Sequence, residues 1–310
     1  MPIAATVCGA ARRRRRSGSG VKRALWAAGF ALLAFAANSV LCRMALRLSH
    51  IDPASFTSIR ILAGALTLGL LAGGAGVRRG SWLSALALLA YAVAFSFAYV
   101  RLTAGTGALL LFGAVQVAMI ATGFFAGERV DRFIVLGWLL AIVGLTVLLL
   151  PGASAPAPRE ALFMLCAGLA WGVYSLRGRG STHALGDTAG NFLRAVPGAL
   201  LVSVLLWARR GADAQGVLLA ALSGALASGL GYAAWYTALP RLGAIAAANA
   251  QLSVPVLAAL AGVALFNEPI TLRLLGASVL VLGGSALAVQ RGLARRDAQR
   301  RAVTADSSAR

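Results

Sequence analysis

Residues 104–126 read AGTGALLLFGAVQVAMIATGFFA and contain no charged side chain. A helix needs about 20 consecutive, mostly apolar residues to cross the hydrocarbon core of a bilayer. The stretch has that length, and its apolar residues do not alternate with polar ones. It therefore predicts a membrane helix and excludes a strand of a membrane β-barrel.

The composition of the whole chain agrees with a membrane protein. Of its 310 residues, 59% are hydrophobic and 12% are charged, and the mean hydropathy is +0.81. Soluble domains are about 45–50% apolar and about 25% charged. The difference excludes a soluble globular enzyme, a disordered protein and a disulfide scaffold, and it leaves an all-α integral membrane protein.

Ten segments of membrane length follow one another along the chain. We predict spans at about 24–42, 54–76, 82–100, 104–126, 133–150, 161–177, 189–207, 216–238, 243–266 and 271–290. The sixth and seventh are the weakest, because Arg177 ends one and Arg194 interrupts the other. The longest break, PGASAPAPRE at 151–160, lies near the middle of the chain and indicates a linker between two halves.

The two halves resemble one another at an offset of 140 residues. Arg101 and Glu128 then align with Arg241 and Glu268, and the members of each pair lie 27 residues apart. Each half has five spans, and an odd number makes the second half enter the membrane from the opposite side. We therefore predict ten transmembrane helices in two inverted five-helix repeats.

The net charge of +20 is concentrated at the two ends of the chain. We divide the chain into a basic tail at 1–23, a first repeat at 24–150, the linker 151–160, a second repeat at 161–290 and a basic tail at 291–310. Basic residues beside the first and last spans are typical of the cytoplasmic face. We therefore predict cytoplasmic termini, a retained first helix and no nucleic-acid partner.

Two arginines lie inside predicted spans, Arg60 early in the second and Arg194 early in the seventh. Each is about 10 Å deep at 1.5 Å per residue. An arginine at the centre of a membrane helix costs at least about 2.5–3.5 kcal/mol, so it usually faces a wet cavity or a partner. A substrate contact is one interpretation; snorkelling to the interface or capping of backbone carbonyls is the other.

Aromatic and amide side chains form the remaining candidate substrate site. The aromatic residues share faces of the third, sixth and eighth spans, and the amides lie at membrane depth: Tyr91, Phe95, Tyr99, Trp171, Tyr174, Tyr232, Trp235, Tyr236, Asn38, Gln116, Asn249 and Gln251. Polar groups in lipid seek partners or water, so we expect most to point inward. They either line a substrate cavity or make interhelical hydrogen bonds, with rings near span ends in an interfacial belt.

The sequence lacks the residue patterns of an enzyme or a cofactor site. No carboxylate lies in the middle of a span, so a proton relay on a central Asp or Glu is not visible. The cysteines Cys8, Cys42 and Cys166 lie far apart, and no metal-ligand cluster or catalytic constellation occurs. We predict no enzyme activity, no metal and no cofactor. Glu268-Pro269 suits the start of a helix, which indicates a structural role for Glu268.

Several motifs resemble those of the EamA-type transporters of the drug/metabolite transporter superfamily. They are the stretch from Asn249 through Pro255 to Glu268-Pro269, its weaker copy ending at Glu128, and Ser58-Ile59-Arg60. The resemblance covers about residues 24–290. It implies a bacterial inner-membrane carrier, often an exporter of amino acids or other small metabolites.

The chain departs from the family pattern in two places. Many members carry a proline in both the fourth and ninth spans, whereas here Pro255 has Val115 and Gln116 at the equivalent place. Small multidrug relatives use a glutamate in the first span, and this chain has none there. Symmetric kinking of the halves and proton coupling by that route are therefore not supported.

We conclude from the sequence that the protein is a secondary transporter of small polar metabolites, with a cavity between its two halves. Its expected partners are a small-molecule substrate and the lipid bilayer, and it is expected to be a monomer or weak homodimer. An uncoupled facilitator, a non-transporting membrane protein and an integral-membrane enzyme are the alternatives.

Overall fold

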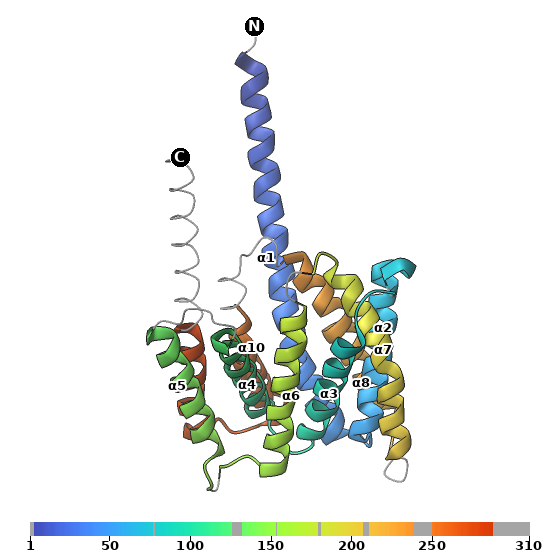
Figure 1. The fold of residues 1–310 in the computed structure, drawn as a ribbon, viewed down its shortest axis with the longest axis vertical. Coiled ribbons are helices and arrows are strands. Elements are labelled where there is room, and N and C mark those ends of the chain that lie inside the picture. The colour runs from blue at the N-terminus through green and yellow to red at the C-terminus, as the bar shows by residue number, and fades with distance from the viewer. Residues whose placement is uncertain are drawn as a thin grey trace.

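The computed structural model describes residues 3–76, 78–125, 132–152, 154–178, 181–206, 211–238 and 250–287, with side chains from residue 24 onward. The described part of the chain is all-α, as the absence of alternating segments predicts. Figure 1 shows helices running roughly along one direction, with the start of the first helix extending beyond one end of the bundle.

The first half supplies five helices. They are α1 (Ile3–Leu48), α2 (Pro53–Gly76), α3 (Trp82–Ala98), α4 (Ala104–Phe125) and α5 (Arg132–Leu149). Four of them match the predicted spans to within two residues at each end. The first is longer than the predicted 24–42 at both ends, so that it carries Arg43 into the bundle.

The second half supplies the remaining described helices. They are α6 (Pro158–Arg177), α7 (Ala184–Leu205), α8 (Ala214–Leu222) with the π-helix η2 (Ser223–Leu230) inside the continuous helix Ala214–Ala238, α10 (Ser253–Phe266) and a helix at Leu272–Leu287. At the start of α8, Asp213 accepts a hydrogen bond from the Gly216 amide, which holds the pKa of its carboxyl below the usual value.

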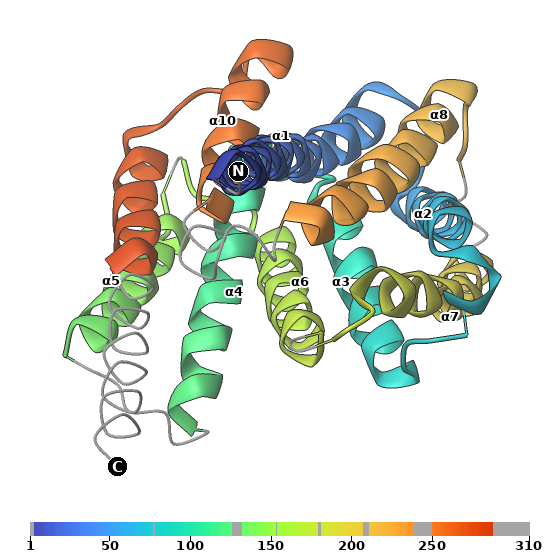
Figure 2. The same ribbon diagram turned by 90° about the horizontal axis from the view of Figure 1, so that it is seen from above.

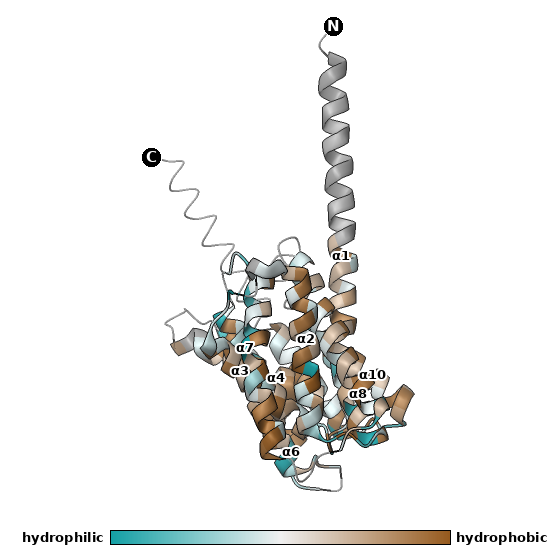
Figure 3. Ribbon diagram, turned by 90° about the vertical axis from the view of Figure 1, so that its right-hand side faces the viewer, coloured by the Kyte–Doolittle hydropathy of each residue, from teal (hydrophilic) through white to brown (hydrophobic). Residues whose placement is uncertain are grey.

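Six described helices are long and apolar enough to cross a membrane, and three more are apolar but shorter. The six belong to α1, α2, α4, α5, α7 and the Ala214–Ala238 helix. Large apolar side chains on the outside of the bundle, such as Leu70, Phe125 and Leu272, are exposed, whereas polar ones such as Thr57 and Ser96 are buried. This distribution is the inverse of a soluble protein and fits an apolar surrounding. Figure 3 shows apolar colour along the helices and hydrophilic colour mainly toward the bundle ends.

The helices of the two halves are interleaved. Viewed from above, α4, α5 and the Leu272–Leu287 helix lie on one side, α2, α3 and α7 lie on the other, and α1 and α6 lie between them (Figure 2). The most extensive packing joins α2 to α7 and α3 to α6, which come from different halves. Neither half therefore buries its inner faces alone.

Glycines permit the close approach of these helices. A Cβ atom on Gly168 of α6 would lie 2.7 Å from the Leu111 carbonyl oxygen and 2.6 Å from the Ala114 Cβ atom of α4. A Cβ atom on Gly276 would have no heavy atom within 4 Å. Small residues thus matter at particular helix contacts, as is common in membrane bundles.

One sequence expectation about a helix start is wrong. Pro269 does not open the last helix, because residues 267–271 are not helical and the helix begins at Leu272. Asn267, with φ of 52°, ends α10 in the left-handed conformation that often terminates helices. Glu268 therefore lies in the connection between α10 and the Leu272–Leu287 helix, where its carboxylate can interact with a different helix.

We predict that Gly168→Ala destabilises the protein, because the added methyl group has to push α4 and α6 apart. Overpacking of this kind costs typically about 1–3 kcal/mol. Gly276→Ala is the matched control, and it should leave stability unchanged or raise it, since alanine favours helix more than glycine does. Thermal unfolding of both purified variants in detergent measures the difference. Equal melting temperatures for the two variants would contradict the close contact.

Candidate functional site

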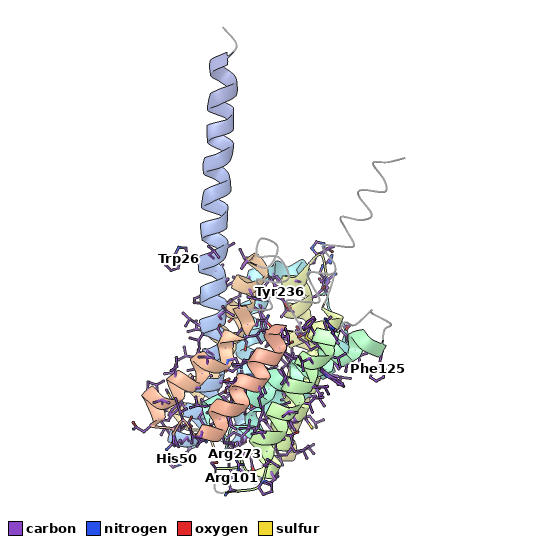
Figure 4. All side chains as sticks on the ribbon, turned by 90° about the vertical axis from the view of Figure 1, so that its left-hand side faces the viewer. Trp26, His50, Arg101, Phe125, Tyr236 and Arg273 are labelled. Atoms are coloured by element: carbon purple, nitrogen blue, oxygen red, sulfur yellow. The ribbon has the colours of Figure 1, made fainter. Side chains whose placement is uncertain are left out.

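A cluster of aromatic side chains lies where helices of both halves meet. We define the central cluster as Phe35, Asn38, Arg60, Tyr91, Phe95, Trp171, Tyr174, Phe192, Tyr232 and Tyr236, which come from α1, α2, α3, α6, α7 and the Ala214–Ala238 helix. It unites rings that the sequence placed in three separate spans. Figure 4 labels Tyr236 near the end of the bundle from which α1 extends, whereas His50, Arg101 and Arg273 lie toward the other end.

Trp171 is the ring that connects the cluster. Its ring is stacked on Tyr232 with centroids 5.6 Å apart and on Tyr174 with centroids 5.3 Å apart. A third ring, Tyr91, lies 4.8 Å from it at a tilt of 48°. Trp171 is half-buried while Tyr91, Tyr174 and Tyr232 are buried. One indole thus bridges α3, α6 and the Ala214–Ala238 helix.

Asn38 links α1 to both α3 and the π-helix. Its Nδ2 donates to the Tyr91 hydroxyl at 3.2 Å, and its Oδ1 accepts from the Ser223 hydroxyl at 2.7 Å. Ser223 is the first residue of η2. A π-helical turn inserts an extra residue into a helix, and such turns occur often at functional sites. The amide at position 38 is therefore satisfied by side chains from two other helices.

Arg60 lies against the other edge of the cluster. It is 1% exposed, and its Cζ atom lies 5.3 Å from the centroid of the Tyr91 ring and 5.0 Å from that of the Phe95 ring. Both distances are in the range of cation–π contacts. Its Nε and Nη1 atoms have no hydrogen-bond partner among the residues that the structure describes.

Hydroxyl groups connect the remaining rings. The Tyr174 hydroxyl donates to Thr188 Oγ1 at 3.5 Å, and the hydroxyls of Thr188 and Tyr236 lie 3.1 Å apart. Thr188 also donates to the Ala184 carbonyl, one turn back in α7. The cluster thus presents flat apolar faces together with several hydroxyl groups and one cation.

A buried ion pair lies beyond the cluster, at the end of α1. Glu268 Oε1 accepts from Arg43 Nε at 3.1 Å, and Glu268 Oε2 accepts from the backbone amide of Ala104, the first residue of α4, at 2.8 Å. Arg43 also donates to the carbonyls of Tyr99 and Val100 at the end of α3. One ion pair therefore joins α1, α3, α4 and the connection after α10, which supports the structural role predicted for Glu268.

Three predicted site residues lie outside the centre of the cluster. Tyr99 is fully buried at the end of α3, where its hydroxyl donates to the Ala104 carbonyl at 3.3 Å. Trp235 packs against Phe35 and α1. Arg194 Nη1 and Nη2 donate to the carbonyls of Arg79 and Arg78, in the connection between α2 and α3. Arg194 is thus found in the carbonyl-capping arrangement that the sequence left open.

Of the four amide side chains predicted for the site, the structure describes three. Gln116 and Gln251 are half-buried on their helices, and within the described segments no hydrogen bond joins either to the central cluster. Asn249 lies outside the described residues. Of the three amides that the structure describes, Asn38 is the one placed in the cluster.

Sequence reasoning missed Phe35, Thr188, Phe192 and Ser223. Phe35 precedes Asn38 by three residues, a helical spacing that marks a shared face and was available as a signal. Ser223 gave no such sequence signal, because serine is common in this chain and a π-helix has no simple sequence pattern. Among the residues that the structure describes, no group of three His, Cys, Asp or Glu side chains is arranged to hold a metal ion.

Comparison with known proteins gives the family and the fold. The model of the EamA-like transporter family matches residues 158–290. An uncharacterized protein of Pseudomonas aeruginosa is 54% identical over 270 residues, which cover 86% of this chain and 94% of that protein. A protein crystal structure with 20% sequence identity superposes with a TM-score of 0.61, over 88% of this chain and 99% of the other.

We predict that Glu268→Gln lowers the free energy of unfolding by about 3–5 kcal/mol, because it leaves the Arg43 charge buried without a counter-ion. Arg47→Gln is the control. Its guanidinium lies 3.9 Å from the same carboxylate but its side chain is 43% exposed, so the loss should stay below about 1 kcal/mol. Denaturant unfolding of purified protein in detergent gives both values. Glu268→Gln at wild-type stability would show that the ion pair is not holding these helices together.

Proposed function

The chain belongs to the EamA-like transporter family and is a multi-pass membrane protein, and from this premise we propose that it is a secondary transporter of small polar metabolites. The transported solute binds in the central cluster, and the two halves rock about it to expose it to either face. Export from the cytoplasm of a bacterium, across its inner membrane, is the direction and location that we assign.

The observation that carries this proposal is the composition of the central cluster. Its side chains come from six helices of both halves, so a relative movement of the halves changes the spacing of the rings. Flat aromatic faces with a few placed polar groups are typical of small-molecule sites. A binding site at the junction of two halves is also the arrangement expected for alternating access.

The pattern of helix packing supports two inverted repeats. If α1 to α5 correspond in order to the five helices of the second half, then α1 is equivalent to α6, and α3 is equivalent to the Ala214–Ala238 helix. The packing of α3 on α6 then corresponds to the packing of the Ala214–Ala238 helix on α1. The contact of α4 with α6 likewise corresponds to that of α10 with α1, and both members of each pair occur. The contacts of α2 with α7 and of α4 with α10 then lie on the axis that relates the halves.

The first experiment is solute flux through the purified protein in liposomes. Vesicles are loaded with an equimolar mixture of amino acids and small carboxylic acids, and solute loss is followed by mass spectrometry. A transporter should release a subset of the mixture faster than protein-free vesicles do. Trp171→Leu should slow this release about three- to tenfold, as expected for the loss of aromatic contacts worth about 0.5–1.5 kcal/mol.

The control for this variant is Trp26→Leu, which removes the same ring from an exposed position on α1 (Figure 4). It should transport at the wild-type rate. No selective release by the wild type would exclude both a coupled carrier and an uncoupled facilitator. An imposed ion gradient separates those two, since only the coupled carrier accumulates solute against its concentration gradient.

We predict that a reporter active only in the cytoplasm is active after Arg310 and silent after residue 155, because both basic tails are assigned to the cytoplasm. Residue 155 lies in the connection between α5 and α6, at the end of the bundle opposite to the start of α1 (Figure 1). A stable full-length fusion that is silent at Arg310 would contradict this topology.

A further inference from the structure

Arg60 is a buried cation without a counter-ion in the described part of the chain. Its side chain is 1% exposed. The ion pairs found among the described residues join Arg43 and Arg47 to Glu268, and none involves Arg60. The central cluster itself contains aromatic, amide and hydroxyl side chains but no carboxylate. The cluster as defined therefore holds one cation and no anion, and the carboxylate of Asp187 acts electrostatically on Tyr174 and Tyr236.

The neighbours of Arg60 satisfy its charge only in part. The Tyr91 and Phe95 rings face the guanidinium and stabilise it through their π-electrons. A ring is not a hydrogen-bond acceptor of the strength that a charged N–H group requires, and Nε and Nη1 remain unpartnered. Buried charged donors without acceptors are unfavourable, so this arrangement is not explained by stability.

The cation lies beside a group of aromatic rings that contact one another. Tyr91 contacts both Arg60 and Trp171, and Trp171 and Tyr232 are stacked with an interplanar angle of 23°. A ligand with an anionic end at Arg60 would place its apolar part against these rings. The hydroxyl of Tyr91 is held by a hydrogen bond from Asn38.

We propose that Arg60 binds the carboxylate of the transported solute, and that the substrates are small organic anions with a planar apolar body. The inference rests on the proposed transport function and narrows it. Carboxylate oxygens accept charge-assisted hydrogen bonds from guanidinium N–H groups, which are stronger than bonds to neutral acceptors. An organic cation would meet like charge at Arg60.

A first test needs no ligand. Arg60→Met keeps much of the side-chain volume but removes the buried charge, so its melting temperature should equal or exceed that of the wild type. Arg194→Met is the matched control: it removes a guanidinium that is bonded to the Arg78 and Arg79 carbonyls, and its melting temperature should fall. Arg60→Met melting below Arg194→Met would make Arg60 a structural residue and would overturn the proposal.

A second test measures charge selectivity with matched probes. Benzoate, phenylacetate and indole-3-acetate are compared with their neutral amides by thermal shift and calorimetry on the full-length protein. At least one acid should bind the wild type about tenfold to a hundredfold more tightly than its amide, as expected for a hydrogen bond to a charged group. Arg60→Met should abolish that preference, Arg60→Lys should keep part of it, and Arg194→Met should leave it unchanged.

The outcomes separate this inference from the proposed function. Binding of amides as tight as that of acids, no binding of any acid, or an acid preference that survives in Arg60→Met would overturn the anion site. If liposomes show selective release of neutral or cationic solutes that Arg60→Met does not slow, transport stands and the anion site falls. If the acids bind through Arg60 but nothing is released from liposomes, the anion site stands and the transport function falls.

Discussion

Inside a bilayer, each polar group must find its partner within the protein, and this constraint organises the structure around a few polar contacts between helices. Glu268 shows it most clearly. Its carboxylate binds Arg43 and caps the first amide of α4, so that one side chain satisfies a cation and a helix N-terminus. Arg43 in turn binds carbonyls at the end of α3. Because Glu268 and Arg43 are buried in the protein, these bonds fix the ends of several helices relative to one another.

The central cluster depends on that arrangement. Between the ends of the helices, α1, α3 and α6 are held close enough for Asn38 to reach Tyr91 and for Trp171 to contact the rings on either side. Hydrophobic burial alone gives little direction to helices in lipid, since the tails are as apolar as leucine. Hydrogen bonds, ring contacts and small residues such as Gly168 therefore decide which helix faces meet, and the site forms where three kinds of contact coincide.

Much of the fold could be predicted, because lipid imposes a minimum length on each helix. The partners of the polar groups could not be predicted in this way. Apolar length located α2, α3, α4 and α5 to within two residues at each end. The aromatic periodicity identified Tyr91, Trp171 and Tyr232, since rings three or four residues apart share a helix face. The partner of Glu268 was missed, because the span predicted to end at residue 42 left Arg43 outside the membrane. Ser223 was missed because a π-turn depends on tertiary packing and leaves no periodic signal.

Arg60 and Arg194 show why a likeness between two halves does not transfer a role. Both lie in the first half of their helices, α2 and α7, and the proposed repeat makes these two helices equivalent. Arg194 lies where the connection between α2 and α3 presents the carbonyls of residues 78 and 79, so its donors are used by backbone. Arg60 instead faces two aromatic rings, and no backbone carbonyl accepts from its Nε or Nη1. The same side chain is thus a structural cap in one half and a free donor in the other. In the anion site that we propose, Arg60 supplies the donor for the carboxylate of the solute, while Arg194 binds backbone carbonyls and stabilises the bundle.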